Sequence, residues 1–385
     1  MTARVALLSH STTPRGGHVH TLGLGEALHR AGLPVHLLAL GDPAKGLYRP
    51  VDLPYTVVKG PARDGTTLGQ RVFASIDLMA AAIAARIDEF DVLHAQDCIA
   101  ASAALRARDL TGSPVRVLRT AHHVDDFTTQ ALIDCQRRAI VQPDRVLVVS
   151  EQWRGILRAD HGVETTVVPN AVDTARFAAA VPAPRPSAGP LLLAVGGIEP
   201  RKGSVVAFRA LAQLGRSADA AGLPRPVLVI VGGHSFQDFA PYRDAALAEL
   251  PSLGLTAGVD VVEVGTVTDA ELGGWYAAAD VLCYPSVVEG FGLVTIEAMS
   301  QGLPVVASDI EVFGEYLTDG VNALLPAAGD PDALAAALRR VLGDTALREG
   351  LRAEGEATVK AYTWEAAAAA HAGIYEELAE TAPGR

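Results

Sequence analysis

The stretch Asp280–Ser308, DVLCYPSVVEGFGLVTIEAMSQGLPVVAS, holds a complete strand-loop-helix-strand unit. The apolar run DVLCYP predicts a buried strand, and the glycine-containing loop SVVEGFG follows it. LVTIEAMSQG then predicts a helix and PVVAS a second buried strand. Strands that are apolar along their whole length are typical of a parallel sheet covered by helices. This stretch therefore predicts an α/β fold.

The same alternation of strand and helix recurs along the chain. Further apolar runs lie at residues 4–9, 35–40, 91–95, 115–120, 145–150, 191–196, 227–232 and 261–265. Residues 178–190, AAAVPAPRPSAGP, carry no periodic pattern and predict an exposed linker. A chain of 385 residues exceeds what one core normally organises. We therefore expect two Rossmann-like, doubly wound parallel-sheet domains facing across a cleft, at residues 1–182 and 183–362.

Composition excludes several function classes. The net charge is −12 and there is no lysine-rich tract, so nucleic acid is not an expected partner. Cys98, Cys135 and Cys283 lack CxxC spacing and predict neither a disulfide framework nor a zinc site. The chain opens without a signal-peptide pattern, which favours a cytoplasmic location. Residues 71–89 suggest a packed surface helix of balanced charge, with a lipid-binding helix as the alternative.

The loop and helix of the opening stretch have the composition of a ligand site. In doubly wound folds, ligands bind at the carboxyl ends of strands. Gly290 and Gly292 allow a close approach of the backbone, and the amides at the helix start can hold a phosphate. Glu297 is near enough to bond a ribose, and Glu289 could reach a sugar beyond the phosphates. The alternative is a solvated Glu289 and a Glu297 that merely favours the helix N-terminus.

This stretch resembles the C-terminal signature of the retaining GT-B glycosyltransferases of family 4 (group 1), PSxxEGFGLxxxEAMxxGxPVVAS. The resemblance implies that Glu289 contacts the sugar of a nucleotide-sugar donor and that Glu297 binds the ribose. It also implies that residues 183–362 form the nucleotide-sugar-binding domain. The backbone that would hold the sugar and the diphosphate belongs to Phe291, Gly292 and Leu293.

The resemblance covers nearly the whole chain and is weakest at residues 43–90. Similar segments are DVLHAQD at 91–97, VVPNAVDTARF at 167–177 and the stretch at 267–286 that leads into the glutamate motif. YTWEAAAAA, at 362–370, is similar to the start of a closing helix that crosses back to the N-terminal domain. Residues 363–385 are therefore expected to join the acceptor-side domain at 1–182.

A glycine pair follows the first predicted strand. Gly16 and Gly17 resemble the pair that faces the donor phosphates and sugar in this family. A dinucleotide fingerprint built on Gly23 and Gly25 fails, because its third glycine position is Leu28 and the pair lies inside the predicted helix. The alternative for Gly16 and Gly17 is an ordinary turn.

AVGGIEPRKGS, at residues 194–204, resembles the family's VGRLxPEKG, whose arginine and lysine clamp the diphosphate. Lys202 is retained, Gly197 stands where the arginine is usual, and Arg201 replaces the glutamate. A lysine alone neutralises phosphate as a point charge, so Lys202 is the main candidate and Arg201 the weaker one. The alternative is a solvent-facing pair. EVFGE at 311–315 replaces the family's GGxPE, which leaves the donor preference open.

TAHHVDDF, at residues 120–127, contains His122, His123, Asp125 and Asp126, which are all residue types that bind metals. Adjacent residues at the end of a strand point in opposite directions, so we do not expect these side chains to share a metal ion. The resemblance implies instead that His122, with His123 as the alternative register, contacts the donor sugar. A hydrogen-bonded histidine without a catalytic role is the other interpretation.

The sequence thus predicts a retaining glycosyltransferase that moves a sugar from a nucleotide-diphosphate donor to an unidentified small-molecule or glycan acceptor. His122, Lys202 and Glu289 are the candidate catalytic residues. Stabilisation of the departing diphosphate by Lys202 and backbone amides would supply most of the catalysis, without metal or cofactor. The alternatives are a GT-B nucleotide-sugar epimerase or hydrolase, and a non-catalytic protein that binds sugar nucleotides.

Overall fold

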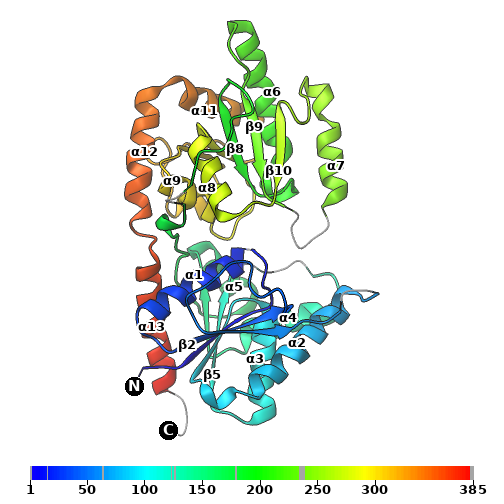
Figure 1. The fold of residues 1–385 in the computed structure, drawn as a ribbon, viewed down its shortest axis with the longest axis vertical. Coiled ribbons are helices and arrows are strands. Elements are labelled where there is room, and N and C mark those ends of the chain that lie inside the picture. The colour runs from blue at the N-terminus through cyan, green and yellow to red at the C-terminus, as the bar shows by residue number, and fades with distance from the viewer. Residues whose placement is uncertain are drawn as a thin grey trace. The chain divides into compact units, whose positions relative to one another are not determined.

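The computed structural model describes residues 2–14, 16–62, 65–122, 124, 127–177, 180–233 and 239–381. The chain forms two compact units (Figure 1). Unit 1 consists of Met1–Ala171 together with Thr363–Arg385, and unit 2 consists of Val172–Tyr362. The proline-rich stretch before strand β8, Leu191–Val195, is held to unit 2. The Ala183 amide donates to the Gly274 carbonyl, and Arg185 donates to the Ala278 carbonyl.

Unit 1 is built on a seven-stranded parallel sheet in the order β3-β2-β1-β4-β5-β6-β7. Its strands are β1 Val5–Ser9, β2 Val35–Gly41, β3 Tyr55–Lys59, β4 Val92–Ala95, β5 Arg116–Ala121, β6 Arg145–Val148 and β7 Thr166–Val167. Strands β1 and β4 are buried along their whole length, as their continuous apolar runs predict.

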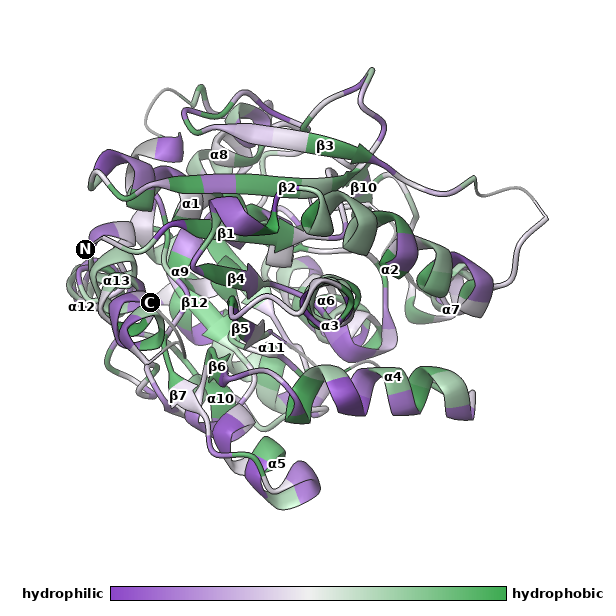
Figure 2. Ribbon diagram, turned by 90° about the horizontal axis from the view of Figure 1, so that it is seen from below, coloured by the Kyte–Doolittle hydropathy of each residue, from purple (hydrophilic) through white to green (hydrophobic). Residues whose placement is uncertain are grey.

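Helices cover both faces of this sheet (Figure 2). They are α1 Gly16–Arg30, α2 Leu68–Ala84, α3 Cys98–Thr111, α4 Gln130–Val141, α5 Glu151–His161 and α13 Trp364–Glu380. Helices α2 and α3 share one core with the sheet, while α1 and α13 share the core on its other face. Gly23 has a packing role in α1, since a Cβ there would lie 2.3 Å from the Trp364 ring.

Unit 2 contains a five-stranded parallel sheet in the order β10-β9-β8-β11-β12. Its strands are β8 Leu191–Val195, β9 Val227–Val231, β10 Val261–Gly265, β11 Val281–Tyr284 and β12 Val305–Ala307. Its helices are α6 Ser204–Ala221, α7 Ala240–Ala248, α8 Asp269–Ala278, α9 Leu293–Ser300, α10 Glu311–Gly314, α11 Pro331–Gly343 and α12 Thr345–Val359. The predicted α/β fold with two doubly wound parallel sheets is confirmed.

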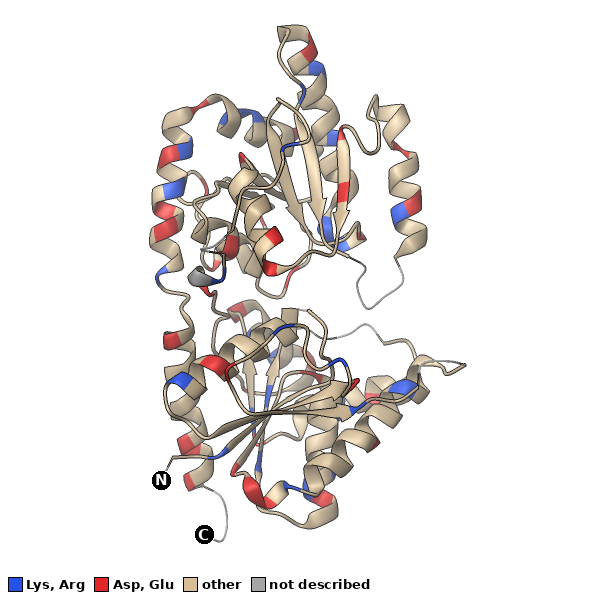
Figure 3. Ribbon diagram, in the orientation of Figure 1, with Lys and Arg blue, Asp and Glu red and all other residues tan. Residues whose placement is uncertain are grey.

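Local sequence signals explain where several helices begin. The Asp97 carboxylate accepts the Ala100 amide at the start of α3, and Thr268 forms a capping box with Glu271 at the start of α8. Charged residues lie mainly on helices and loops, and the strands carry few of them (Figure 3). Among the described residues, no helix is long and apolar enough to cross a membrane.

The strand orders give each sheet a switch point, where successive connections run to opposite sides. In unit 1 it lies between β1 and β4, and in unit 2 between β8 and β11. Loops that leave neighbouring strands at a switch point diverge and open a crevice at the carboxyl edge of the sheet, where ligands of this fold class bind. Lys202 follows β8, and Glu289 follows β11. Gly16 and Gly17 open the helix after β1, and His122 follows β5.

Candidate functional site

The loops after β8 and β11 approach each other closely at the switch point of unit 2. A Cβ on Gly203 would lie 2.0 Å from the Pro285 carbonyl oxygen, so only glycine fits between the two loops. The Val287 amide donates to the Arg201 carbonyl at 2.8 Å. This backbone contact places Lys202, from the first loop, beside the second loop.

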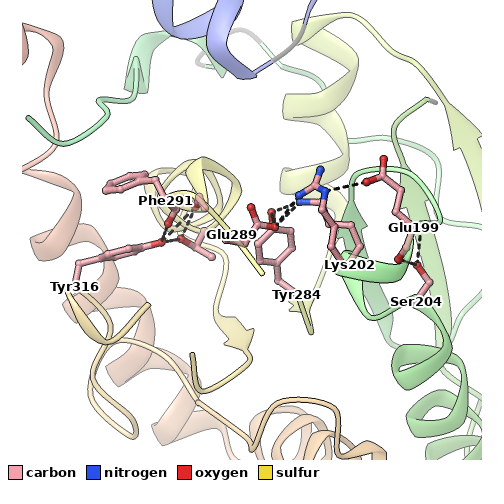
Figure 4. A network of polar contacts seen from close by, with 10 residues as sticks. Glu199, Lys202, Ser204, Tyr284, Glu289, Phe291 and Tyr316 are labelled. Atoms are coloured by element: carbon pink, nitrogen blue, oxygen red, sulfur yellow. Dashed lines mark hydrogen bonds and ion pairs between the residues drawn. The ribbon is translucent and has the colours of Figure 1, made fainter. Parts of the chain in front are cut away.

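Lys202 meets Glu289 and Tyr284 at this point (Figure 4). The Lys202 ammonium donates to Glu289 Oε1 at 2.7 Å and to the Tyr284 hydroxyl oxygen at 2.5 Å. The Tyr284 hydroxyl in turn donates to Glu289 Oε1 at 2.8 Å. Both charged side chains are mostly buried, with 13% of Lys202 and 9% of Glu289 exposed. The structure thus brings together two candidates that lie far apart in the sequence.

The pKa values of this pair show how burial and charge compete. Burial lowers the pKa of Lys202, and the Glu289 carboxylate opposes that effect. Burial would raise the pKa of Glu289, but the charges of Lys202 and Arg201 outweigh it and leave that pKa below its usual value. An ionised Glu289 carboxylate thus faces the largely desolvated Lys202 side chain, and this ion pair places its cation where it can bind an anion.

Arg201 is the second cation of this cluster. Its Nη1 lies 3.5 Å from Glu289 Oε1, and its Nε lies 3.0 Å from Glu199 Oε2. Arg201 is 44% exposed and therefore reaches the surface next to the buried Lys202. A side chain at Gly197 would start 2.7 Å from the Gly233 carbonyl oxygen, so the backbone would have to shift to admit one there.

The glycine turn at residues 290–292 starts α9. Gly292 adopts a left-handed conformation with φ of 88°, and a Cβ there would lie 2.4 Å from the Phe313 ring. The Tyr316 hydroxyl donates to the Phe291 carbonyl at 2.7 Å, and the two rings stack with centroids 5.1 Å apart (Figure 4). Phe313 and Tyr316, which come from the segment that begins with EVFGE, therefore hold the turn in place, a role that the sequence analysis missed.

Glu297 lies in α9 with its carboxylate bound on both sides. Arg176 donates to its Oε1 at 2.9 Å, and Tyr276 donates to its Oε2 at 2.9 Å. Burial raises the pKa of Glu297 above its usual value, although Arg176 and Tyr276 act in the opposite direction. Arg176 belongs to the segment VVPNAVDTARF, to which the sequence analysis assigned no function.

In unit 1 the structure brings Gly17, Gln96 and His122 together at the carboxyl edge of the sheet. His122 Nε2 lies 3.0 Å from Gln96 Oε1. A Cβ on Gly17 would lie 3.6 Å from the His122 ring, whereas one on Gly16 would meet nothing within 4 Å. Gly16 is exposed at the start of α1, so the backbone there is open to a ligand.

A chain of buried polar groups continues from Gln96. Its Nε2 lies 3.1 Å from His94 Nε2, and His94 also contacts the Thr120 hydroxyl at 2.7 Å and the Tyr375 hydroxyl at 2.8 Å. The His20 ring lies edge-on to His122, with centroids 4.8 Å apart. Burial lowers the pKa of His20 and of His94 well below the usual value, so these imidazoles are neutral.

The structure describes only some of the remaining candidate residues. His123, Asp125 and Asp126 lie outside the described residues. The Asp97 carboxylate caps α3 and also lies 2.9 Å from His10 Nδ1. Within the described ranges, no group of three or more His, Cys, Asp or Glu side chains is placed to hold a metal ion.

Comparisons of the sequence with known proteins divide it in the same two parts. The profile of "Glycosyltransferase Family 4" matches residues 14–176, and that of "Glycosyl transferases group 1" matches residues 189–344. The phosphatidyl-myo-inositol mannosyltransferase of Mycolicibacterium smegmatis is 30% identical over 380 residues, covering 95% of this chain and 91% of that protein. The D-inositol 3-phosphate glycosyltransferase of Xylanimonas cellulosilytica is 34% identical over 234 residues, 57% of this chain and 52% of that protein.

Solved structures share the fold. The sucrose-phosphate synthase of Thermosynechococcus elongatus superimposes with a TM-score of 0.78 at 23% identity, covering 97% of this chain and 99% of that one. Anabaena HepE, solved with UDP and glucose, has a TM-score of 0.79 at 20% identity, covering 97% of this chain and 100% of that one. At these identities the likeness establishes the two-domain α/β architecture.

Proposed function

The chain belongs to glycosyltransferase family 4 (group 1) and is a glycosyltransferase, and from that premise we propose that unit 2 binds a nucleotide-diphosphate sugar whose glycosyl group is transferred with retention at the anomeric carbon. The observation that carries the proposal is the Lys202–Glu289 pair at the switch point between β8 and β11. It places a buried cation and a carboxylate beside a glycine turn that opens a helix.

Lys202 suits the diphosphate. An ammonium group has three N–H donors, and Glu289 and Tyr284 accept two of them. The third can go to a phosphate oxygen, and the backbone amides at the start of α9 can bind a second oxygen with the helix dipole behind them. Arg201, beside Lys202, supplies a further cation at the surface. A diphosphate held in this way requires no metal ion.

The chemistry follows from where charge develops. As the bond from the anomeric carbon to the diphosphate breaks, negative charge grows on the leaving oxygen, and Lys202 with the backbone of Phe291, Gly292 and Leu293 stabilises it. The leaving phosphate oxygen then takes the proton of the acceptor hydroxyl. Glu289 binds hydroxyl groups of the transferred sugar, so neither it nor Glu297 has to act as a nucleophile.

The other candidate residues take supporting roles in this proposal. Glu297 binds the ribose of the nucleotide. In unit 1, His122 and the backbone of Gly16 and Gly17 contact the donor sugar and its phosphates. The position of His122 at the end of β5, fixed by Gln96, supports this role.

The acceptor that we propose is an inositol-containing compound. Two relatives of this chain are named for inositol acceptors, one phosphatidyl-myo-inositol and the other D-inositol 3-phosphate. At the carboxyl edge of the unit 1 sheet, the partly exposed His122 imidazole is held by the Gln96 amide, and hydrogen-bonding groups of this kind suit a polyol. We also propose a cytoplasmic location, since Cys135 and Cys283 are buried free thiols.

The test is a direct assay of transfer. The purified protein is incubated with UDP-, GDP- and ADP-sugars, each with myo-inositol, inositol 3-phosphate, phosphatidylinositol vesicles or no acceptor. Mass spectrometry detects the product, and NMR gives its anomeric configuration. A retained configuration on an inositol acceptor supports the proposal, and an inverted one contradicts it. Donor turnover in buffer alone would indicate a hydrolase or an epimerase, and failure to bind any nucleoside diphosphate would refute the donor site.

A further inference from the structure

We propose that Arg176 is a positioning residue that aims the Glu297 carboxylate at the ribose of the donor nucleotide and thereby makes the enzyme select ribonucleotides over deoxyribonucleotides. The inference rests on the proposed function of Glu297 and goes beyond it, because it assigns a role to residues of the 3₁₀ turn Thr174–Phe177 and of α8.

The Arg176 guanidinium bridges two carboxylates. Its Nη1 donates to Glu297 Oε1 at 2.9 Å, and its Nη2 donates to Asp269 Oδ1 at 2.5 Å. Glu297 lies in α9 and Asp269 begins α8, so the arginine links two helices to the turn that carries it. A planar guanidinium fixes the direction of the carboxylates that it binds, which a lysine cannot do.

The opposite side of Glu297 is fixed as well. The buried Tyr276 donates its hydroxyl to Glu297 Oε2 at 2.9 Å. The Phe177 ring lies edge-on to Tyr276, with centroids 5.4 Å apart, and the Arg176 guanidinium lies 5.0 Å from the Phe177 centroid. Each carboxylate oxygen is therefore held by a donor that is itself packed in place.

Glu297 retains the capacity to bind a diol in this arrangement. An ionised carboxylate has about four acceptor positions, of which Arg176 and Tyr276 take two. The side chain of Glu297 is 10% exposed and that of Arg176 is 18% exposed, so a narrow part of this pair reaches the surface. Two adjacent hydroxyls, as on a ribose, match two acceptor positions on one carboxylate.

The charge of Arg176 also decides whether Glu297 can accept. Burial raises the pKa of Glu297 and Asp269 raises it further, while Arg176 and Tyr276 lower it. Among the described residues, these are the charged and titratable groups that act most strongly on the carboxylate. Without Arg176, a larger share of Glu297 would carry a proton and present fewer acceptors to the ribose.

The experiment measures the binding of ribo- and deoxyribonucleotides by calorimetry. UDP and 2′-deoxy-UDP, or the guanine pair if the protein prefers it, are titrated into the wild-type protein and into Arg176→Gln. The wild type should bind the ribonucleotide about 10-fold more tightly than the deoxynucleotide, because a bond to the carboxylate is lost. In Arg176→Gln that ratio should fall toward 1, with most of the loss on the ribonucleotide.

Two further variants separate positioning from folding. Arg176→Lys keeps the positive charge but lacks the planar guanidinium. It should therefore restore part of the preference for the ribonucleotide over the deoxyribonucleotide. Asp269→Asn leaves Arg176 intact and removes a charge that raises the pKa of Glu297. The pH at which ribose discrimination disappears should therefore rise in Arg176→Gln and fall in Asp269→Asn. Arg209→Gln, at an exposed pair with Glu249, is the control and should match the wild type.

The outcomes distinguish this inference from the function on which it rests. Equal affinity of the wild type for the two nucleotides would refute the assignment of Glu297 to the ribose, and this inference with it. A wild type that discriminates, together with an Arg176→Gln variant that keeps the full ratio, would overturn the role of Arg176 alone. If Arg176→Gln fails to fold, the test is Asp269→Asn. The proposed role of Arg176 is overturned if the pH at which ribose discrimination disappears is the same in Asp269→Asn as in the wild type.

Discussion

The carboxyl edges of the two sheets occupy equivalent places in their units and differ in chemistry. At the switch point of unit 2, a buried lysine is paired with a glutamate, and an arginine lies next to them. At that of unit 1, Gln96 joins the buried, neutral His94 to His122 through hydrogen bonds. Strand order fixes where a ligand can bind, and the side chains decide whether that ligand is an anion or a polyol.

Burial acts in opposite ways on these two edges. In unit 2 burial lowers the pKa of Lys202, and the carboxylate that faces this desolvated side chain opposes the shift. In unit 1 the imidazoles lie against one another, and desolvation keeps His20 and His94 neutral. The comparison predicts that unit 2 depends on charge and that unit 1 depends on the neutral state of its histidines.

The largest effect is expected for Lys202→Ala. In the proposed mechanism this variant removes the cation that stabilises the departing diphosphate, and kcat should fall by about 10³-fold, the scale for loss of one charge-stabilising donor. Steady-state kinetics measure this. Arg209→Ala is the matched control, since that cation is 52% exposed and pairs with Glu249 away from the site, and its kcat should equal the wild-type value. If kcat falls by less than 10-fold in Lys202→Ala, the inference that unit 2 depends on charge is wrong.

Acid should weaken unit 1 through its neutral histidines. Burial lowers the pKa of His18 and of His371 from 6.5 to about 4. Between these values the unfolded chain binds protons that the folded chain does not, so stability is full above pH 6.5 and falls as pH drops toward 4. The low pKa of each histidine should reduce the free energy of unfolding by on the order of 3 kcal/mol as the pH falls from 6.5 to 4.

This loss is measured by urea unfolding at pH 7.5, 6, 5 and 4.5, followed by tryptophan fluorescence. In Trp275→Phe the remaining tryptophans, Trp153 and Trp364, both report on unit 1. His371→Phe should flatten the pH dependence in the same background, because it removes one of the titrating groups. If the free energy of unfolding stays constant from pH 7.5 to 4.5, the prediction that folding keeps His18 and His371 neutral is wrong.

A smaller effect is expected from the glycine turn of unit 2. Gly292→Ala adds a Cβ 2.4 Å from the Phe313 ring at a φ of 88°, so the turn must shift. We expect a loss of about 2 kcal/mol in unfolding free energy, together with weaker binding of the nucleoside diphosphate. Gly314→Ala is the control, since a Cβ there meets nothing within 4 Å. Thermal melts and calorimetry would show the difference, and equal behaviour of the two variants would argue against a strained turn.

The smallest effect is expected for Gln96→Leu in unit 1. The variant removes the acceptor that orients His122 and the contact to His94, without changing any charge. We expect kcat to fall by about 5-fold with little change in KM for the donor, because a hydrogen bond contributes about 1 kcal/mol. Gln130→Leu, at an exposed contact with Asp134, is the control. A larger change in KM than in kcat would place Gln96 in donor binding instead.

Parts of the site were predictable because they are local in sequence. The apolar run at 280–285, the glycine turn and the helix that follows form one continuous segment, so the position of Glu289 and Glu297 at a strand-to-helix junction could be read directly. Lys202 was found because it lies in a short segment that resembles the family's motif. The first inference uses spacing along the chain, and the second uses the resemblance to the family's motif.

The supporting residues were not predictable in this way. Arg176 is 121 residues from Glu297, and Tyr316 reaches the glycine turn from beyond β12. Gln96 meets His122 across neighbouring strands, 26 residues apart. Such contacts arise only after the sheet order is fixed, and a single sequence contains no periodicity that pairs these residues.

The sequence by itself determined the α/β class, the order of strands and helices, and the segments that carry the chemistry, because continuous apolar runs and glycine-rich junctions are local signals. The tertiary structure alone decided which side chains meet: Lys202 with Glu289, Arg176 with Glu297, and Gln96 with His122. The reason is that strand order joins loops from distant parts of the chain at one edge of a sheet, and burial there sets the charge that each group carries.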